Sequence, residues 1–137
     1  MNIGVGEFLE KTSKLRKKAE KVAALKFNDS YAIRTVLQGV FDPRITWLLP
    51  EGEPPYAPNT LPDQQNVFLN QCRKLAYFVE GGAPNLKQSK RELLFTELLE
   101  SIHPADAKML VAVKDKKLPW PGITEDVVRE AFPDLLP

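Results

Sequence analysis

The sequence contains one cysteine, Cys72, and one histidine, His103, and this scarcity excludes several kinds of site. A single cysteine forms no internal disulfide and no cysteine-based metal cluster. Cys72 lies within an apolar helical pattern, so we interpret it as a small buried thiol rather than a nucleophile, which would need a positioned base. A chain without disulfides fits a reducing compartment. We therefore expect a cytoplasmic protein that is stabilised by an apolar core.

Other chemistry-bearing motifs are also missing. His103 precedes Pro104 at an expected helix start, which favours a capping or loop role over a catalytic base. Gly81 and Gly82 end a helix, and no glycine-rich phosphate loop occurs. The carboxylates are scattered and lack the alternating spacing of a calcium loop. We predict no catalytic residue, no metal site, no cofactor and no small-molecule substrate.

Long apolar runs and a large net charge are absent as well. No run of about 18 apolar residues occurs and the first residues carry no apolar signal core, so we expect neither a membrane span nor export. A length of 137 residues suits one domain, which we place at 1–137. The formal net charge is +1, so attraction to a polyanion would need a local basic patch.

The sequence does contain a succession of apolar residues at three- and four-residue spacing, which is typical of helices. We predict an all-α fold of about six or seven helices. A first short helix is followed by a cap at Thr12 and Ser13 and by a second helix. Asn28-Asp29-Ser30 then ends this second helix and caps the next one. Further helices are expected at 31–41, from Asp63 to about Val79, at 86–101, from Pro104 onwards, and after a cap at Thr124.

Two segments between these helices have a different character. After a break at 42–44, the consecutive apolar residues of 45–49 favour a helical turn over a strand. Segment 50–62 contains five prolines, a density that neither a helix nor a central strand tolerates. We predict an extended loop there, with Tyr56 exposed beside two consecutive prolines. Loops of this length are often functional or mobile.

The basic residues are unevenly distributed. Residues 1–27 carry a net charge of +4, and residues 119–137 carry −3. The lysine-rich face near the second helix is either an ordinary solvated surface or a secondary phosphate-contacting face. Its residues are Lys14, Arg16, Lys17, Lys18 and Lys21.

Two further basic clusters lie beside expected helix starts, where unpaired backbone N–H groups and the helix dipole favour an anion. The first occupies the opening turns of the 86–101 helix, and the second the loop before the last helix. Basic side chains do not help an isolated helix start, which prefers acids, so their placement suggests phosphate contact. The residues are Lys87, Lys90, Arg91, Lys114, Lys116 and Lys117.

Five strings also carry a family resemblance. They are Val22-Ala23-Ala24-Leu25-Lys26, the helix of 33–37 running into Phe41-Asp42-Pro43-Arg44, the helix of 93–102, the string 104–110, and the closing string 128–137. In this order they resemble the N-terminal DNA-binding domain of ATP-dependent DNA ligases, particularly phage ligases. The chain is also similar to small, free-standing proteins of large contractile-tailed phages.

The resemblance implies a helical module that grips duplex DNA across the minor groove, through backbone phosphates and without sequence preference. It also implies a location in the infected bacterial cell. Lys114-Asp115-Lys116 lacks the glycine of the Lys-x-Asp-Gly nucleotidyl-transfer motif, and the prolines at 119 and 121 alter the loop that would face the groove. The implied phosphate contacts are Lys87, Lys90, Arg91, Lys114, Lys116, Lys117 and Thr124.

Three hypotheses follow. The first is a non-catalytic, sequence-nonspecific accessory protein that binds double-stranded DNA. The second is a protein-interaction module that has lost DNA binding and acts on a phage or host replication or transcription factor; the near-neutral charge and the proline-rich loop favour it. The third is a structural component of the phage particle.

Overall fold

The computed structural model describes residues 3–61 and 67–137. Over this part of the chain there are seven α-helices, one 3-10 helix and no strand, so the all-α prediction is confirmed. The helices are α1 (Val5–Ser13), α2 (Lys18–Phe27), α3 (Tyr31–Phe41), α4 (Val67–Gln71), η1 (the 3-10 helix, Cys72–Phe78), α5 (Gln88–Ser101), α6 (Pro104–Lys114) and α7 (Glu125–Ala131).

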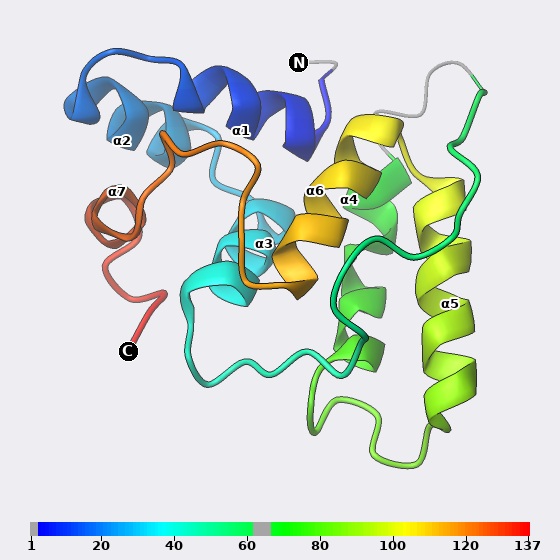
Figure 1. Ribbon diagram of the computed structural model, residues 1–137. Coiled ribbons are helices and arrows are strands. Elements are labelled where there is room, and N and C mark those ends of the chain that lie inside the picture. The colour runs from blue at the N-terminus through cyan, green and yellow to red at the C-terminus, as the bar shows by residue number, and fades with distance from the viewer. Residues whose placement is uncertain (1–2, 62–66) are drawn as a thin grey trace.

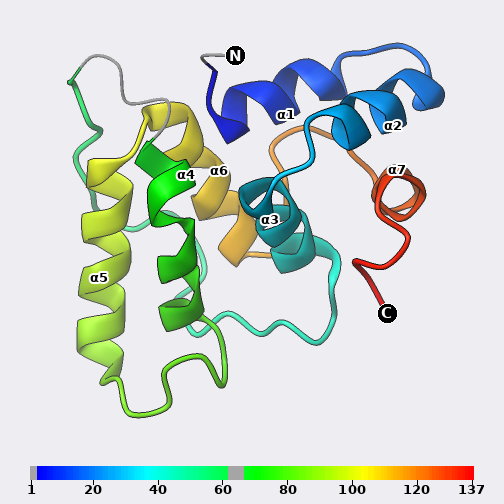
Figure 2. The same cartoon turned by 180° about the vertical axis from the view of Figure 1, so that it is seen from behind.

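Two groups of helices flank a central pair (Figures 1 and 2). α3 and α6 form the central pair and contact each other. On one side α1 and α2 pack together and α7 packs against α2, while on the other side α5 packs against η1. α6 joins the groups because it contacts both α1 and α5. Among the described residues, no helix combines the length and the apolar character that crossing a membrane requires.

The buried side chains form one cluster that extends through both groups. Leu9, Leu37, Phe68 and Met109, from four different helices, are fully buried, and each contributes about 1.5–3 kcal/mol on burial. Cys72 is buried as predicted, and this burial raises the pKa of its thiol. The Cys72 side chain therefore packs as a small apolar residue of the core.

Three helix starts have the caps that the sequence predicts. Ser30 Oγ accepts from the Ile33 N–H at 3.2 Å at the start of α3. His103 Nδ1 accepts from the Ala105 N–H at 3.0 Å at the start of α6, which confirms its capping role. Thr124 Oγ1 accepts a longer bond of 3.4 Å from the third residue of α7. Such caps are local, so the sequence alone indicates them.

The predicted cap at Thr12 and Ser13 is wrong. α1 continues through both residues, and Thr12 Oγ1 donates back to the Phe8 carbonyl at 2.9 Å. α2 begins at Lys18, where Glu20 Oε1 accepts the Lys17 N–H at 3.2 Å. Thr12 faces the core, so its hydroxyl bonds to the backbone of α1 and does not cap the next helix.

The helical turn predicted for 45–49 is also wrong. Trp47 pairs with Val79 in an isolated antiparallel bridge, with the Leu48 N–H donating to the Phe78 carbonyl at 2.8 Å. The Trp47 indole N–H donates to the Gly39 carbonyl at 2.9 Å. A Cβ at Gly39 would lie 2.8 Å from Trp47 Cζ2, so the glycine admits the ring. The segment is therefore fixed by long-range contacts.

The helix predicted from Asp63 to Val79 has two parts in the described chain, α4 and then η1. A 3-10 helix of seven residues is unusually long, and side chains in it recur every three residues. This repeat is compatible with the burial of Cys72, Leu75 and Phe78 on one face. Pro62 and Asp63 lie outside the described residues.

Residues 49–61, which we call the strap, cross in front of α5 and α6 without helix or strand (Figure 1). The Gly52 N–H donates to Asp115 Oδ2 at 3.1 Å, and the Ala57 N–H donates to Glu100 Oε2 at 2.8 Å. The prediction that Tyr56 is exposed is wrong, because Tyr56 is half-buried against the core and burial raises the pKa of its phenol. The strap is thus attached to the helices.

Candidate interaction surfaces

Arg91 of α5 is 6% exposed, although the sequence suggests that it contacts phosphate. Its guanidinium joins the end of η1 to the start of α5 by hydrogen bonds within the protein. The acceptors are the carbonyls of Tyr77 (2.9 Å), Ala83 (3.2 Å) and Leu86 (3.3 Å) and Oε1 of Gln88 (2.6 Å). All three guanidinium nitrogens donate in this network, so the side chain has a structural role.

Lys114 is the last residue of α6. The prediction that it lies in the following loop is therefore wrong. Its side chain is 2% exposed, and Nζ lies 2.9 Å from Asp115 Oδ1. A charge this deep is stable only with a partner, which Asp115 provides. The Lys114 ammonium is therefore buried and paired within the protein.

Lys116 has a left-handed backbone (φ 62°) at the end of α6. The Lys117 N–H donates to the Ala112 carbonyl at 3.0 Å, which is the closing bond of a helix C-terminus that usually uses glycine. Lys116 Nζ donates to the Asp42 carbonyl at 2.7 Å, and burial lowers the pKa of this lysine. Asp42 itself is held by Arg44, which lowers the pKa of the carboxyl to about 2.

The two predicted basic clusters consequently leave three exposed cations, Lys87, Lys90 and Lys117. The start of α5 and the end of α6 lie apart in both views, so these cations do not form one site (Figures 1 and 2). Thr124 is occupied as the cap of α7. Among the described residues, the two basic clusters predicted to contact phosphate therefore do not come together in one site.

The secondary basic face is partly neutralised. Lys14 lies 3.5 Å from Glu10, and Lys18 lies 3.7 Å from Glu130. Lys21 Nζ donates to the Gly122 carbonyl at 2.8 Å. Arg16 and Lys17 remain exposed in the turn between α1 and α2.

An exposed aromatic surface lies where α2 passes into α3. Phe27, the last residue of α2, is 90% exposed, and Tyr31, the first residue of α3, is 55% exposed. The Arg73 guanidinium lies 4.7 Å from the centre of the Tyr31 ring. We call Phe27, Tyr31 and Arg73 the aromatic face; Figure 2 shows the α2–α3 link and the α4–η1 segment on the same side.

The helical pattern of the sequence indicates the exposure of Phe27 but not the aromatic face as a whole. The inward residues of the second helix, Val22 and Leu25, recur at a spacing that excludes Phe27 from the same helical face. The contact of Arg73 with Tyr31 joins residues that are far apart in the chain, and no local pattern indicates it.

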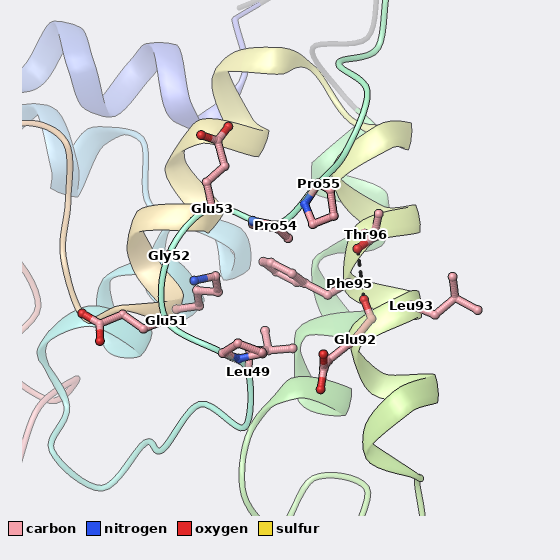
Figure 3. A pocket seen from close by; sticks show the side chains of 12 residues that line it. Leu49, Glu51, Gly52, Glu53, Pro54, Pro55, Glu92, Leu93, Phe95 and Thr96 are labelled. Atoms are coloured by element: carbon pink, nitrogen blue, oxygen red, sulfur yellow. Dashed lines mark hydrogen bonds between the residues drawn. The ribbon is translucent and has the colours of Figure 1, made fainter.

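A groove of about 480 Å³ lies between the strap and α5. Figure 3 shows Phe95 reaching from α5 towards the strap, with Leu49 and Pro54 nearby. Glu51 and Glu53 of the strap and Glu92 of α5 line the groove, and in Figure 3 their carboxylates point away from the Phe95 ring in different directions. Lys114 also lines the groove.

A protein-family model described as a family of unknown function (DUF6433) matches residues 8–119. The chain belongs to this family. The comparison with curated proteins and the comparison with solved structures found no match. The description of DUF6433 names no activity, so the resemblance to ligase domains stays a prediction.

The DUF6433 span contains both surfaces described above. It includes the whole aromatic face and every residue that lines the groove, and it ends before Thr124 and α7. Both surfaces therefore belong to the part of the chain that the family model describes.

Proposed function

We propose that this protein is a non-catalytic protein-interaction module whose aromatic face binds a partner protein with an apolar pocket for Phe27. The observation that carries the proposal is the 90% exposure of Phe27. Covering a phenylalanine ring releases about 1.5–3 kcal/mol of binding free energy. Aromatic and arginine side chains are also enriched among the residues that dominate binding energy at protein interfaces.

The other surfaces support this choice over duplex binding. Of the seven residues predicted to contact phosphate, Arg91, Lys114, Lys116 and Thr124 have hydrogen bonds or ion pairs within the protein. By contrast, the Arg73 guanidinium packs on the Tyr31 ring, and side chains that are ordered before binding lose less entropy on association.

We expect Phe27→Ser to weaken capture of the partner about 10–100-fold, because the lost burial of the ring corresponds to one or two factors of ten in affinity. The chain is immobilised and exposed to a nuclease-treated lysate of the cells that encode it, and captured proteins are quantified by mass spectrometry. A partner identified in this way is then titrated in pure form.

Leu61→Ser is the matched control, since Leu61 is 66% exposed and lies on the strap rather than on the aromatic face. It should capture the partner as the unchanged chain does. Equal capture by the unchanged chain and by Phe27→Ser would contradict the proposal.

Duplex DNA binding is the second candidate, supported by the ligase resemblance and by the exposed cations Lys87, Lys90 and Lys117. If each neutralises one phosphate, log K against log salt has a slope of about −2.7. Fluorescence anisotropy with a labelled duplex measures this slope, and Lys87→Gln with Lys90→Gln should reduce its magnitude by about 1.8. The paired change of Lys74 and Lys108 to glutamine is the control, and a flat anisotropy signal at low salt rejects this candidate.

A further inference from the structure

A hollow of about 190 Å³ opens within the aromatic face, between α3 and η1 (Figure 2). Two members of that face, Tyr31 and Arg73, line the hollow. It shares no lining residue with the groove beneath the strap. One surface of the molecule therefore carries both a projecting ring, Phe27, and a depression.

The lining of the hollow is suited to an uncharged side chain. Most of the side chains that line it are apolar or aromatic, and none is acidic. The Trp47 indole N–H already donates to the Gly39 carbonyl, so this ring offers no free donor. Arg73 is the one charged lining residue, and its guanidinium packs on the Tyr31 ring. We therefore expect an apolar occupant.

The volume of the hollow is suited to one phenyl ring, since a protein cavity of about 150 Å³ holds a benzene molecule. Phe27 is the most exposed large apolar side chain of the described residues. The two other exposed aromatic side chains in this part of the chain already have ring contacts, Tyr31 with Arg73 and Tyr77 edge-on with Phe78. Phe27 is thus the ring that this chain offers to a hollow of this size.

We propose that a second copy of this chain fills the hollow, in a two-fold symmetric dimer in which Phe27 of each copy inserts between α3 and η1 of the other. A two-fold interface uses the same surface on both subunits, so the ring and the hollow must lie on one face. The formal net charge of +1 adds little long-range repulsion between copies. The dimer rests on the proposed function, in which Phe27 anchors a partner, and identifies that partner.

The area of the two rings sets the expected strength of the dimer. A buried aromatic side chain contributes about 150–250 Å² of surface, whereas stable interfaces bury about 1,200–2,000 Å². The two Phe27 rings therefore cover only part of what a stable dimer needs. We expect a small interface and a reversible dimer with a dissociation constant in the micromolar range.

Sedimentation equilibrium of the full chain, from micromolar to millimolar concentration, tests the proposal. We expect the average mass to rise with concentration from 15.5 kDa towards twice that value. Phe27→Ser removes two rings from each dimer and should weaken dimerisation at least about 100-fold. Leu61→Ser, at an exposed position of the strap, should dimerise as the unchanged chain does.

A second variant changes the hollow and leaves Phe27 in place. Ala76→Gln puts a longer polar side chain at an exposed lining position and should also weaken dimerisation, whereas Ala57→Gln on the strap should not. In a mixture of ¹³C-labelled and unlabelled chains, isotope-filtered NOE spectra should connect the Phe27 ring of one copy to the Ala76 methyl group of the other.

A chain that sediments as a monomer at millimolar concentration overturns the proposed dimer. The capture experiment with Phe27→Ser then still decides whether Phe27 binds a different protein, so the two proposals fail separately. A dimer that is unchanged by Phe27→Ser or by Ala76→Gln also overturns the proposal, because its contact would lie elsewhere on the molecule.

Discussion

Replacing Arg91 with alanine is expected to lower the free energy of unfolding by about 1–3 kcal/mol, because removal of this buried donor leaves its acceptors unsatisfied. The variant would leave the carbonyls of Tyr77, Ala83 and Leu86 without this donor, between the end of η1 and the start of α5. Urea denaturation followed by far-UV circular dichroism measures the change.

Lys90→Ala is the control, since this neighbour is exposed and its removal should change stability by less than about 0.5 kcal/mol. Arg91→Lys should be intermediate, because an ammonium does not reproduce the planar fork of a guanidinium. If Arg91→Ala is as stable as the unchanged chain and loses only DNA affinity, the role that we assign to the side chain is wrong.

The burial of Arg91 and Lys114 was indicated by the same periodicity that predicts the helices. Arg91 precedes Phe95 by four residues and Leu98 by seven, so all three lie on one face of α5. Lys114 follows Leu110 by four residues, so these two also lie on one face of α6. A basic residue on an apolar face is a candidate for an internal ion pair or hydrogen-bond network rather than for a surface charge.

The hydrogen-bond partners of buried side chains, unlike their burial, are not indicated by the periodicity of the sequence. Local features such as the caps at Ser30 and Thr124 follow from neighbouring residues, and the sequence predicts them. Lys116 bonds to Asp42 across 74 positions, and Trp47 pairs with Val79 through the packing of the whole molecule. Contacts of this kind depend on which helices become neighbours, and that information is not contained in periodicity or composition. The groove cannot be predicted from local pattern either, because the strap forms one of its sides and α5, a separate segment of the chain, forms the other.

Asp106, in the first turn of α6, is a further buried carboxyl that the sequence pattern does not indicate. Its side chain is completely buried, and Oδ1 accepts the Gly6 N–H of α1 at 2.6 Å. Oδ2 has no hydrogen-bond partner among the residues that the structure describes. A Cβ at Gly6 would lie 2.8 Å from the Ala105 carbonyl oxygen, so glycine allows α1 to approach α6 closely.

Burial raises the pKa of Asp106 to about 6, against the lowering effects of the Gly6 hydrogen bond and of His103. Glu7 of α1 acts in the raising direction, and its carboxylate lies 3.5 Å from His103 Nε2. The folded state therefore binds this proton more tightly than the unfolded state, in which an aspartate titrates near pH 3.9. The stability that this group provides is fully present below about pH 4 and is lost as the pH rises through 6.

The Asp106→Asn variant should reveal this titration. Its amide oxygen can still accept from Gly6, but it carries no charge at any pH. A difference of about two pKa units corresponds to about 3 kcal/mol, so the unchanged chain should lose about that much stability relative to the variant between pH 4 and pH 7. Groups distant from Asp106 contribute equally to both stability curves, so the difference between the curves reports Asp106 together with its neighbours Glu7 and His103. Asp126→Asn, at an exposed position of α7, is the control for the loss of one negative charge. Parallel curves for Asp106→Asn and the unchanged chain would show that the carboxyl of Asp106 titrates in the folded protein as it does in the unfolded one.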